Sequence, residues 1–222
     1  MTVRRSALLV TKNDFRLQRD GGSKRTAAVV TALESMGYQV DWVAARPFVS
    51  SVAGPSASLS GAEVLKIGRV VLRAICSASL SVLKWQSLAA IRQTVQLAAR
   101  TEYDLFVVEH SQLEPYALAG MARVKCIDLH NIESELLRNF ALSSSSRIES
   151  ALGSYESWRM RAVERAIPRR FDIVSTVSER DADLLREEGP EPRASIVVAP
   201  NGISKEFFGV DGKAMNTCIL LV

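Results

Sequence analysis

The chain has 222 residues, of which 47% are hydrophobic and 23% charged, and this ordinary globular mixture excludes a wholly disordered protein. The net charge is +4 with the cations dispersed along the sequence, which suits anionic substrates or an acidic membrane surface without choosing between them. Three widely spaced cysteines indicate neither a disulfide framework nor a zinc site, and no apolar stretch approaches the roughly 20 residues of a membrane span, so we expect a cytoplasmic protein.

Six runs rich in branched residues predict strands, at 6–12, 38–45, 104–110, 124–130, 171–177 and 194–200. Their continuous apolar character is typical of strands that are covered on both faces. Helical segments are expected between them, at 23–36, 84–100, 112–121, 132–141, 147–166 and 178–188. This alternation predicts an α/β fold with a doubly wound, mostly parallel, Rossmann-like sheet that binds ligands at the carboxyl ends of its strands.

The sequence "RDGGSKRT" follows the first predicted strand. Gly21 and Gly22 would let backbone amides approach a ligand closely, and Ser23 could cap the helix that follows, so this loop can hold an anion. Lys24 and Arg25 would then be added countercharges; the alternative is that both are solvated surface residues. The spacings of the P-loop and of the dinucleotide fingerprint are absent, which argues against a dehydrogenase.

The two histidines, His110 and His130, both fall at the carboxyl ends of predicted strands, which converge on one cleft in this kind of sheet. Each could hold or release a proton near neutrality, or each could be a structural hydrogen-bonding residue. Asn131 and Glu133 could bind hydroxyl groups of a substrate. Alternatively, Asn131 caps the helix that starts at Ile132.

Two other patterns lie in predicted helices. Glu156 and Glu164, and likewise Glu179 and Glu187, are separated by an E-x7-E spacing, and we expect both pairs on solvated faces. The segment 61–85 mixes basic with apolar residues, so it is either a basic amphipathic helix that docks on anionic lipid or a helix packed against the sheet.

Five motifs, in this order and spacing, resemble the N-terminal domain of family 4 glycosyltransferases of the GT-B fold. They are "DGGSKRT", "DLFVVEHSQ", "DLHNIESELLR", "FDIVSTVSERDADLL" and "VVAPNGIS", and the resemblance covers almost the whole chain. It implies the N-terminal half of a GT-B architecture. It also implies a retaining transferase that moves a sugar from a nucleotide-sugar donor to a hydroxyl of a glycan or lipid-linked acceptor, with no metal or other cofactor and no nucleic-acid partner.

The resemblance also assigns roles to residues. In such enzymes the glycine-rich loop lies beside the donor phosphates, which would give Gly22 a backbone contact and make Lys24 and Arg25 contacts to the donor phosphates or to an anionic acceptor. The histidine that matches His110 lies near the transferred sugar and the acceptor. The residues that match the family's "PNG" turn at the interdomain cleft are Asn201 and Gly202, whereas Ser204 stands where the family commonly has aspartate.

By the same resemblance, the chain divides into a Rossmann-like acceptor-side domain (1–200), an interdomain connector (201–216) and the first strand of a truncated donor-binding domain (217–222). Because the family binds the nucleotide mainly in its second domain, we expect negligible sugar transfer by these 222 residues alone. A peripheral position at the inner membrane face is a further expectation. The alternative is a noncatalytic binding module that pairs with another chain.

Overall fold

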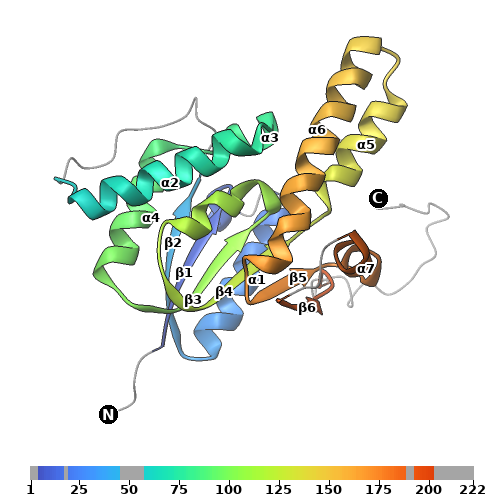
Figure 1. Ribbon diagram of the computed structural model, residues 1–222. Helices are drawn as coiled ribbons and strands as arrows, with labels where there is room; N and C mark the ends of the chain where they lie inside the picture. Colours follow the sequence, from blue (N-terminus) through green and yellow to red (C-terminus); the bar gives the residue numbers. More distant parts are fainter. Residues whose placement is uncertain (1–4, 18–19, 46–57, 189–192, 203–222) are drawn as a thin grey trace, which may run out of the picture.

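The computed structural model describes residues 5–17, 20–45, 58–188 and 193–202 (Figure 1). In these residues six strands form one parallel sheet in the order β2-β1-β3-β4-β5-β6. Every predicted strand is present with its ends shifted by at most two residues, and the predicted doubly wound, parallel α/β fold is confirmed. The strands are β1 (Arg5–Thr11), β2 (Tyr38–Ala44), β3 (Tyr103–Glu109), β4 (Ala122–Leu129), β5 (Ile173–Thr176) and β6 (Ser195–Val198).

Helical segments connect the strands much as the sequence predicts, with two corrections. The helix expected over 84–100 begins only at Leu88, because Ser87 caps it and a short separate helix precedes it. The segment expected as a helix over 112–121 is a 3-10 helix at Ser111–Leu118 that contains Pro115, which has no amide hydrogen to donate. The α-helices are α1 (Gly21–Ser35), α2 (Gly61–Ser77), α3 (Leu80–Leu83), α4 (Leu88–Arg100), α5 (Glu133–Ser143), α6 (Arg147–Ala166) and α7 (Glu179–Glu188).

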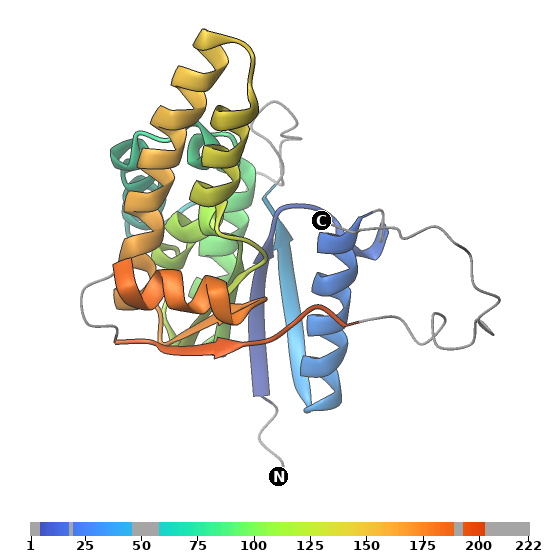
Figure 2. The ribbon, with the colours of Figure 1, turned by 90° about the vertical axis from the view of Figure 1, so that its right-hand side faces the viewer.

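Helices cover both faces of the sheet, which explains the continuous apolar runs of the strands. On β1, Leu8 and Val10 belong to the larger core cluster, whereas Leu9 packs on the opposite face with Val30 of α1. Figure 2 shows α1 on one side of the sheet and the hairpin of α5 and α6 on the other. This hairpin extends beyond the sheet (Figure 1).

The start of α1 differs from the prediction. Its N-cap is Asp20 and not Ser23: a carboxylate oxygen of Asp20 accepts the Ser23 amide at 2.7 Å, and the Ser23 hydroxyl accepts the Asp20 amide at 3.1 Å. This reciprocal capping box satisfies two amides that a helix end otherwise leaves without partners. Ser23 is therefore a buried residue within the first turn of α1, and the helix begins about one turn earlier than expected.

The first glutamate pair contradicts its prediction. Glu156 and Glu164 are only 5% and 2% exposed, not solvated. Glu156 accepts two backbone amides at the start of α3, both at 3.0 Å, and Glu164 accepts two at the start of α5, at 2.7 and 3.3 Å. Each carboxylate caps a helix that lies far away in the sequence, which periodicity within α6 could not reveal. The second pair, Glu179 and Glu187, is exposed as predicted.

Within 61–85, α2 packs one face against the rest of the domain, since Val70 and Ala74 are 0% and 1% exposed. The packing alternative is therefore confirmed for that face. The opposite face leaves large apolar side chains exposed, at Val64, Leu65, Leu72 and Ile75. In the residues that the structure describes, no helix combines the length and apolar character that crossing a membrane requires. The expected connector beyond Gly202, including Ser204, and the expected strand at 217–222 lie outside the described residues.

Candidate functional site

A cleft of about 370 Å³ opens where β1, β3 and β4 end. β1 lies between β2 and β3, so the strand order reverses at this point, and such switch points are where open parallel sheets bind ligands. The loops after these strands and the first turn of α1 supply the walls. The lining residues are Thr11, Lys12, Asn13, Asp20, Gly21, Gly22, Ser23, Arg25, Thr26, His110, His130, Asn131 and Asn201.

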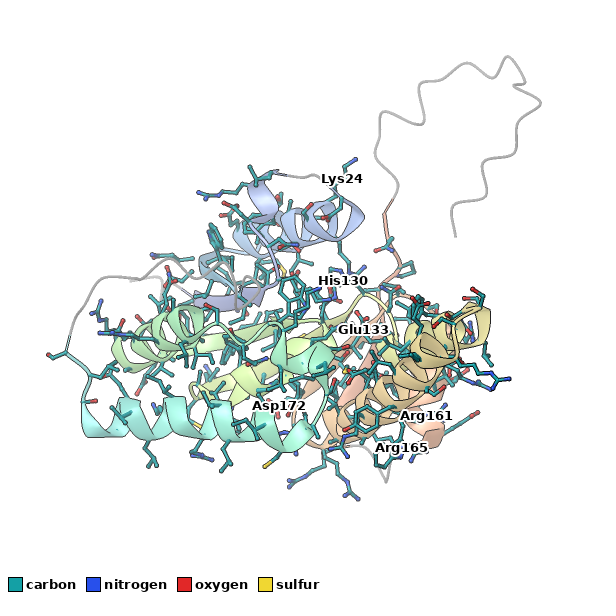
Figure 3. The ribbon with its side chains drawn as sticks, turned by 90° about the horizontal axis from the view of Figure 1, so that it is seen from above. Lys24, His130, Glu133, Arg161, Arg165 and Asp172 are labelled. Carbon is teal, nitrogen blue, oxygen red and sulfur yellow. The ribbon has the colours of Figure 1, made fainter. Side chains whose placement is uncertain are left out.

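The side chains of the two consecutive cations of α1, Lys24 and Arg25, point in different directions. Arg25 turns inward, where its guanidinium donates to both carboxylate oxygens of Asp128 at 2.8 and 2.6 Å and to Asn201 Oδ1 at 3.1 Å. The side chains of Arg25 and Asp128 are only 10% and 5% exposed, so this is a buried, bidentate ion pair. Lys24 is exposed, is absent from the cleft lining and projects away from His130 (Figure 3).

The diglycine corner, which we define as Gly21 and Gly22 with Asp20 before them, forms one wall of the cleft. A β-carbon on Gly22 would lie 3.4 Å from Asp20 Oδ1 and 3.5 Å from His130 Nδ1, whereas one on Gly21 would meet nothing within 4 Å. Gly22 therefore lies directly beside the imidazole of His130. The carboxylate of Asp20 already accepts the Ser23 amide, so an incoming anion at this corner meets a negative charge and needs cations close by.

The rings of His110 and His130 lie side by side, with centroids 4.0 Å apart. His110 has φ 66° and ψ 144°, a left-handed backbone that a non-glycine residue adopts only where its surroundings impose it. Its amide donates to the Asp128 carbonyl at 2.9 Å and thereby ties β3 to β4. Burial, together with the charge of Lys12, lowers the pKa of His110 to about 2. His110 is consequently neutral near pH 7 and can offer hydrogen bonds but no exchangeable charge.

These features are carried by a recognisable domain. A family model described as "Glycosyl transferase 4-like domain" matches residues 20–202, which include the diglycine corner and both histidines. The chain belongs to the glycosyltransferase 4-like family. A comparison with curated proteins found no match. The resemblance read from the five sequence motifs is thus confirmed, and the α/β sheet of this glycosyltransferase 4-like domain is consistent with one half of a GT-B enzyme.

Below the cleft floor of the glycosyltransferase 4-like domain lies a buried polar cluster. Glu109 is 0% exposed, and its Oε2 is 2.7 Å from the Thr26 hydroxyl. Burial raises the pKa of Glu109. Burial alone would also raise the pKa of Asp128, but the hydrogen bonds from Arg25 outweigh it and hold that pKa below its usual range. Two neighbouring carboxyls are therefore pushed in opposite directions, which is common at functional sites.

Lys12 is a cleft residue that the sequence analysis did not single out. It directly follows β1, its ammonium lies 3.5 Å from Glu133 Oε1, and it also lies over the ring of Trp85 at 5.4 Å from the centroid. Burial lowers the pKa of Lys12, and Glu133 offsets part of that effect. Its position at the carboxyl end of the first strand was the available signal, because that edge of the sheet forms the cleft.

The remaining predicted site residues divide into two groups. Asn131 and Asn201 line the cleft, and Asn131 does not cap α5, whose N-cap is Ile132 with the Glu164 carboxylate accepting the first amides. Glu133 does not line the cleft but holds Lys12, and Gly202 is exposed outside the lining. The structure thus brings eight predicted residues to one cleft: Gly21, Gly22, Ser23, Arg25, His110, His130, Asn131 and Asn201.

Proposed function

We propose that this domain takes part in moving a sugar from a nucleotide-sugar donor to an acceptor hydroxyl, with retention of configuration and without a metal ion. Membership of the glycosyltransferase 4-like family supports sugar transfer in general. The observation that carries the finer proposal is that the diglycine corner and both imidazoles line one cleft at the strand switch point.

In this proposal the donor phosphates lie against Gly22, where only a residue without a side chain leaves the space beside His130 open. His130 Nδ1 faces this space. Two cations line the cleft, Lys12 and Arg25, and Lys12 is held less tightly, since its ammonium lies 3.5 Å from Glu133 whereas the Arg25 guanidinium lies 2.6 Å from Asp128. Arg25 acts indirectly, because Asp128 and Asn201 already occupy its guanidinium. Neutral His110 would hold a hydroxyl of the transferred sugar or the acceptor.

The test measures the binding of UDP-glucose and of GDP-mannose by isothermal titration calorimetry. Gly22→Val places a branched side chain between Asp20 and His130, and we expect it to weaken binding of the preferred donor at least tenfold, which corresponds to about 1.4 kcal/mol. Gly61→Val is the control, since it changes a glycine in the first turn of α2 that has open space around it. Equal affinities of the two variants for the donor would contradict the proposed phosphate position.

The same proposal includes negligible turnover by the 222 residues alone. Orientation of donor and acceptor can account for about 7–11 kcal/mol of a barrier, and by resemblance the family contributes further donor contacts, including a basic pair, from its second domain. Release of free nucleotide from UDP-glucose or GDP-mannose in the presence of simple sugar acceptors measures this. Robust product formation would contradict it while leaving the proposed reaction intact.

We also propose a peripheral position on an anionic, cytoplasmic membrane face. The surface involved, here called the outer face, combines exposed side chains of α2, α3 and α6. Two hydrogen bonds join the helices beneath it, from Tyr155 Oη to the Ala78 carbonyl at 3.1 Å and from Arg159 Nε to the Ser77 carbonyl at 2.7 Å. The exposed apolar members are Leu65, Leu72, Ile75, Leu80, Tyr155 and Trp158.

The composition of the outer face suits lipid. Trp158 and Tyr155 have the amphipathic rings that membrane interfaces favour, and the same helical region carries the exposed cations Arg69, in α2, and Lys84, directly after α3. A cation near an anionic surface contributes about 1 kcal/mol of binding free energy.

Co-sedimentation with vesicles tests the membrane proposal. We expect the protein to bind phosphatidylglycerol-containing vesicles, to bind pure phosphatidylcholine vesicles much less, and to dissociate with salt. Leu72→Ser with Ile75→Ser should reduce binding at least fivefold. Met121→Ser is the control, because Met121 is 76% exposed but directly precedes β4 at the amino edge of the sheet. Equal binding by the double variant and the control would exclude the outer face as the membrane contact.

A further inference from the structure

Two buried polar atoms beneath the cleft face each other without a hydrogen-bond partner. They are Glu109 Oε1 and His130 Nε2, and they lie 3.9 Å apart. The side chain of Glu109 is 0% exposed and that of His130 is 7% exposed, so water does not readily satisfy either atom. Because the large majority of buried polar atoms are hydrogen-bonded, this pair requires an explanation.

The charges around the pair limit the explanation. Arg25 neutralises Asp128 through two short bonds, so the pair formed by Glu109 and His130 must itself be close to neutral to be tolerated at this depth. Two arrangements meet that condition: a protonated Glu109 with a neutral His130, or an ionised Glu109 with a protonated His130. In both, the pair shares one proton. The groups that face Glu109 are the hydroxyls of Thr11 and Thr26, the imidazole of His130 and the charges of Asp128, Arg25 and Lys12.

The contacts of Glu109 place its proton on Oε1 when the cleft is empty. The Thr26 hydroxyl donates to Glu109 Oε2 at 2.7 Å, so Oε1, which faces His130 without a partner, is the oxygen that carries the proton. A protonated Glu109 spares a fully buried side chain the cost of carrying a charge on an oxygen that lacks a partner. Burial raises the pKa of Glu109, and it outweighs the hydrogen bonds from Thr11 and Thr26, which lower it.

The other ring nitrogen of His130 points to the proposed anion position. Its Nδ1 lies 3.5 Å from where a β-carbon on Gly22 would be, while Nε2 lies 3.4 Å from Asp128 Oδ2 and 3.9 Å from Glu109 Oε1. The imidazole therefore bridges the diglycine corner and the buried carboxyls. A positive charge on the ring would therefore attract both an anion at the diglycine corner and the buried carboxylates.

We propose that Glu109 is a positioning residue that stores a proton for His130. When an anion binds at the diglycine corner, the proton leaves Glu109 Oε1 and bonds to His130 Nε2, so that Glu109 becomes a carboxylate and His130 an imidazolium that donates from Nδ1 to the anion. No proton enters from solvent. The inference rests on the proposed function only for the place of the anion. The 3.9 Å separation closes with a ring movement of about 1 Å, and such bonds commonly tighten on ligand binding.

A metal ion is the competing use of the same groups. Glu109, Asp128 and His130 each offer a ligand atom, and these atoms lie within 4.8 Å of one another. Both oxygens of Asp128, however, already accept from Arg25, whose positive charge would repel a divalent cation at this position. A proton meets no such obstacle.

Sulfate is the probe for the test, because it does not titrate near neutral pH. Its affinity for the full chain is measured by NMR titration between pH 6.5 and 8. The wild type should show a flat profile, since its proton is supplied internally. Glu109→Gln has the shape of the protonated acid but no proton to give, so we expect its affinity to fall by up to about tenfold per pH unit.

Glu156→Gln is the matched control, a buried glutamate that accepts amides at the start of α3 and does not face His130. It should retain the flat profile of the wild type. A flat profile for Glu109→Gln, or a steep one for the wild type, would overturn the proposal even though sulfate binds.

A second measurement requires no ligand. The carboxyl carbon of Glu109 in the free protein, followed by ¹³C NMR, should still report the protonated form at pH 6, and ordinary titration near pH 4.3 would overturn the proposal. If the wild type does not bind sulfate, the proposed anion position fails and this titration still decides the state of Glu109. Stoichiometric Zn²⁺ binding that is lost in Glu109→Gln would replace the stored proton with a metal site.

Discussion

The cleft floor and the outer face distribute polar and apolar groups in opposite ways. The floor buries Glu109, Asp128 and His130, whereas the outer face leaves Leu72 and Trp158 each 61% exposed. The buried charge of Asp128 is tolerated on the floor because Arg25 pairs with both of its oxygens, and this pair holds the neighbouring groups in place. Exposed apolar side chains cost little in folding but favour contact with an apolar surface. Removing a side chain should therefore lower the free energy of unfolding strongly on the floor and change it little on the outer face.

The largest effect is expected for Arg25→Ala. It leaves Asp128 as a buried carboxylate without its bidentate partner, and breaking a buried pair in this way costs about 3–5 kcal/mol in the free energy of unfolding. Lys24→Ala, one position earlier on the exposed side of α1, should change it by less than about 0.5 kcal/mol. Urea denaturation of the two variants measures both values. Similar losses in both would remove the distinction between the inward and the outward cation.

The next effect concerns pH. Burial raises the pKa of Glu164 to about 7, although backbone amides that it accepts work in the opposite direction. Between about pH 4.3 and pH 7 the folded state therefore keeps a proton that the unfolded chain has lost, so this group should lower the free energy of unfolding by about 3 kcal/mol as the pH rises through that range.

Glu164→Gln removes that contribution. The difference in unfolding free energy between wild type and variant should consequently change with pH over this range, and Glu179→Gln, whose side chain is 75% exposed, should show no such change. Urea denaturation at several pH values supplies the comparison. A constant difference for Glu164→Gln would show that the helix cap holds an ordinary carboxylate.

A smaller loss is expected for Glu156→Ala. It leaves two amides at the start of α3 and the Ser79 hydroxyl without their acceptor, for about 1–3 kcal/mol. The exposed Glu187→Ala is the control and should be nearly neutral. Thermal unfolding of both variants tests whether the capping carboxylate, and not charge alone, holds α3 to α6.

The smallest effect should come from the outer face. Ile75→Ser changes a side chain that is 57% exposed, and we expect less than about 0.5 kcal/mol in unfolding free energy. Val70→Ala on the buried face of the same helix should cost about 2 kcal/mol. A large loss for Ile75→Ser would mean that the side chain packs within the fold, and the outer face would no longer be a free surface.

Much of the fold and part of the cleft could be predicted from local patterns. The apolar runs locate all six strands, and the rule that parallel sheets bind ligands at their carboxyl ends places His110 and His130 in one cleft. The assignment of caps was less successful. Asp20 and Ser23 are both good N-cap residues, and only the geometry of the chain entering α1 selects the first of them.

What the sequence by itself determined is the order of strands and helices, the parallel sheet and the edge where the cleft forms, because these follow from periodicity within each segment. The tertiary structure alone decided that Arg25 turns inward to Asp128 while Lys24 does not, and that the Glu164 carboxylate caps α5. Those choices depend on partners 103 and 31 residues away in the chain. The energy of a charge is set by what folding places beside it, and no local pattern records that neighbour.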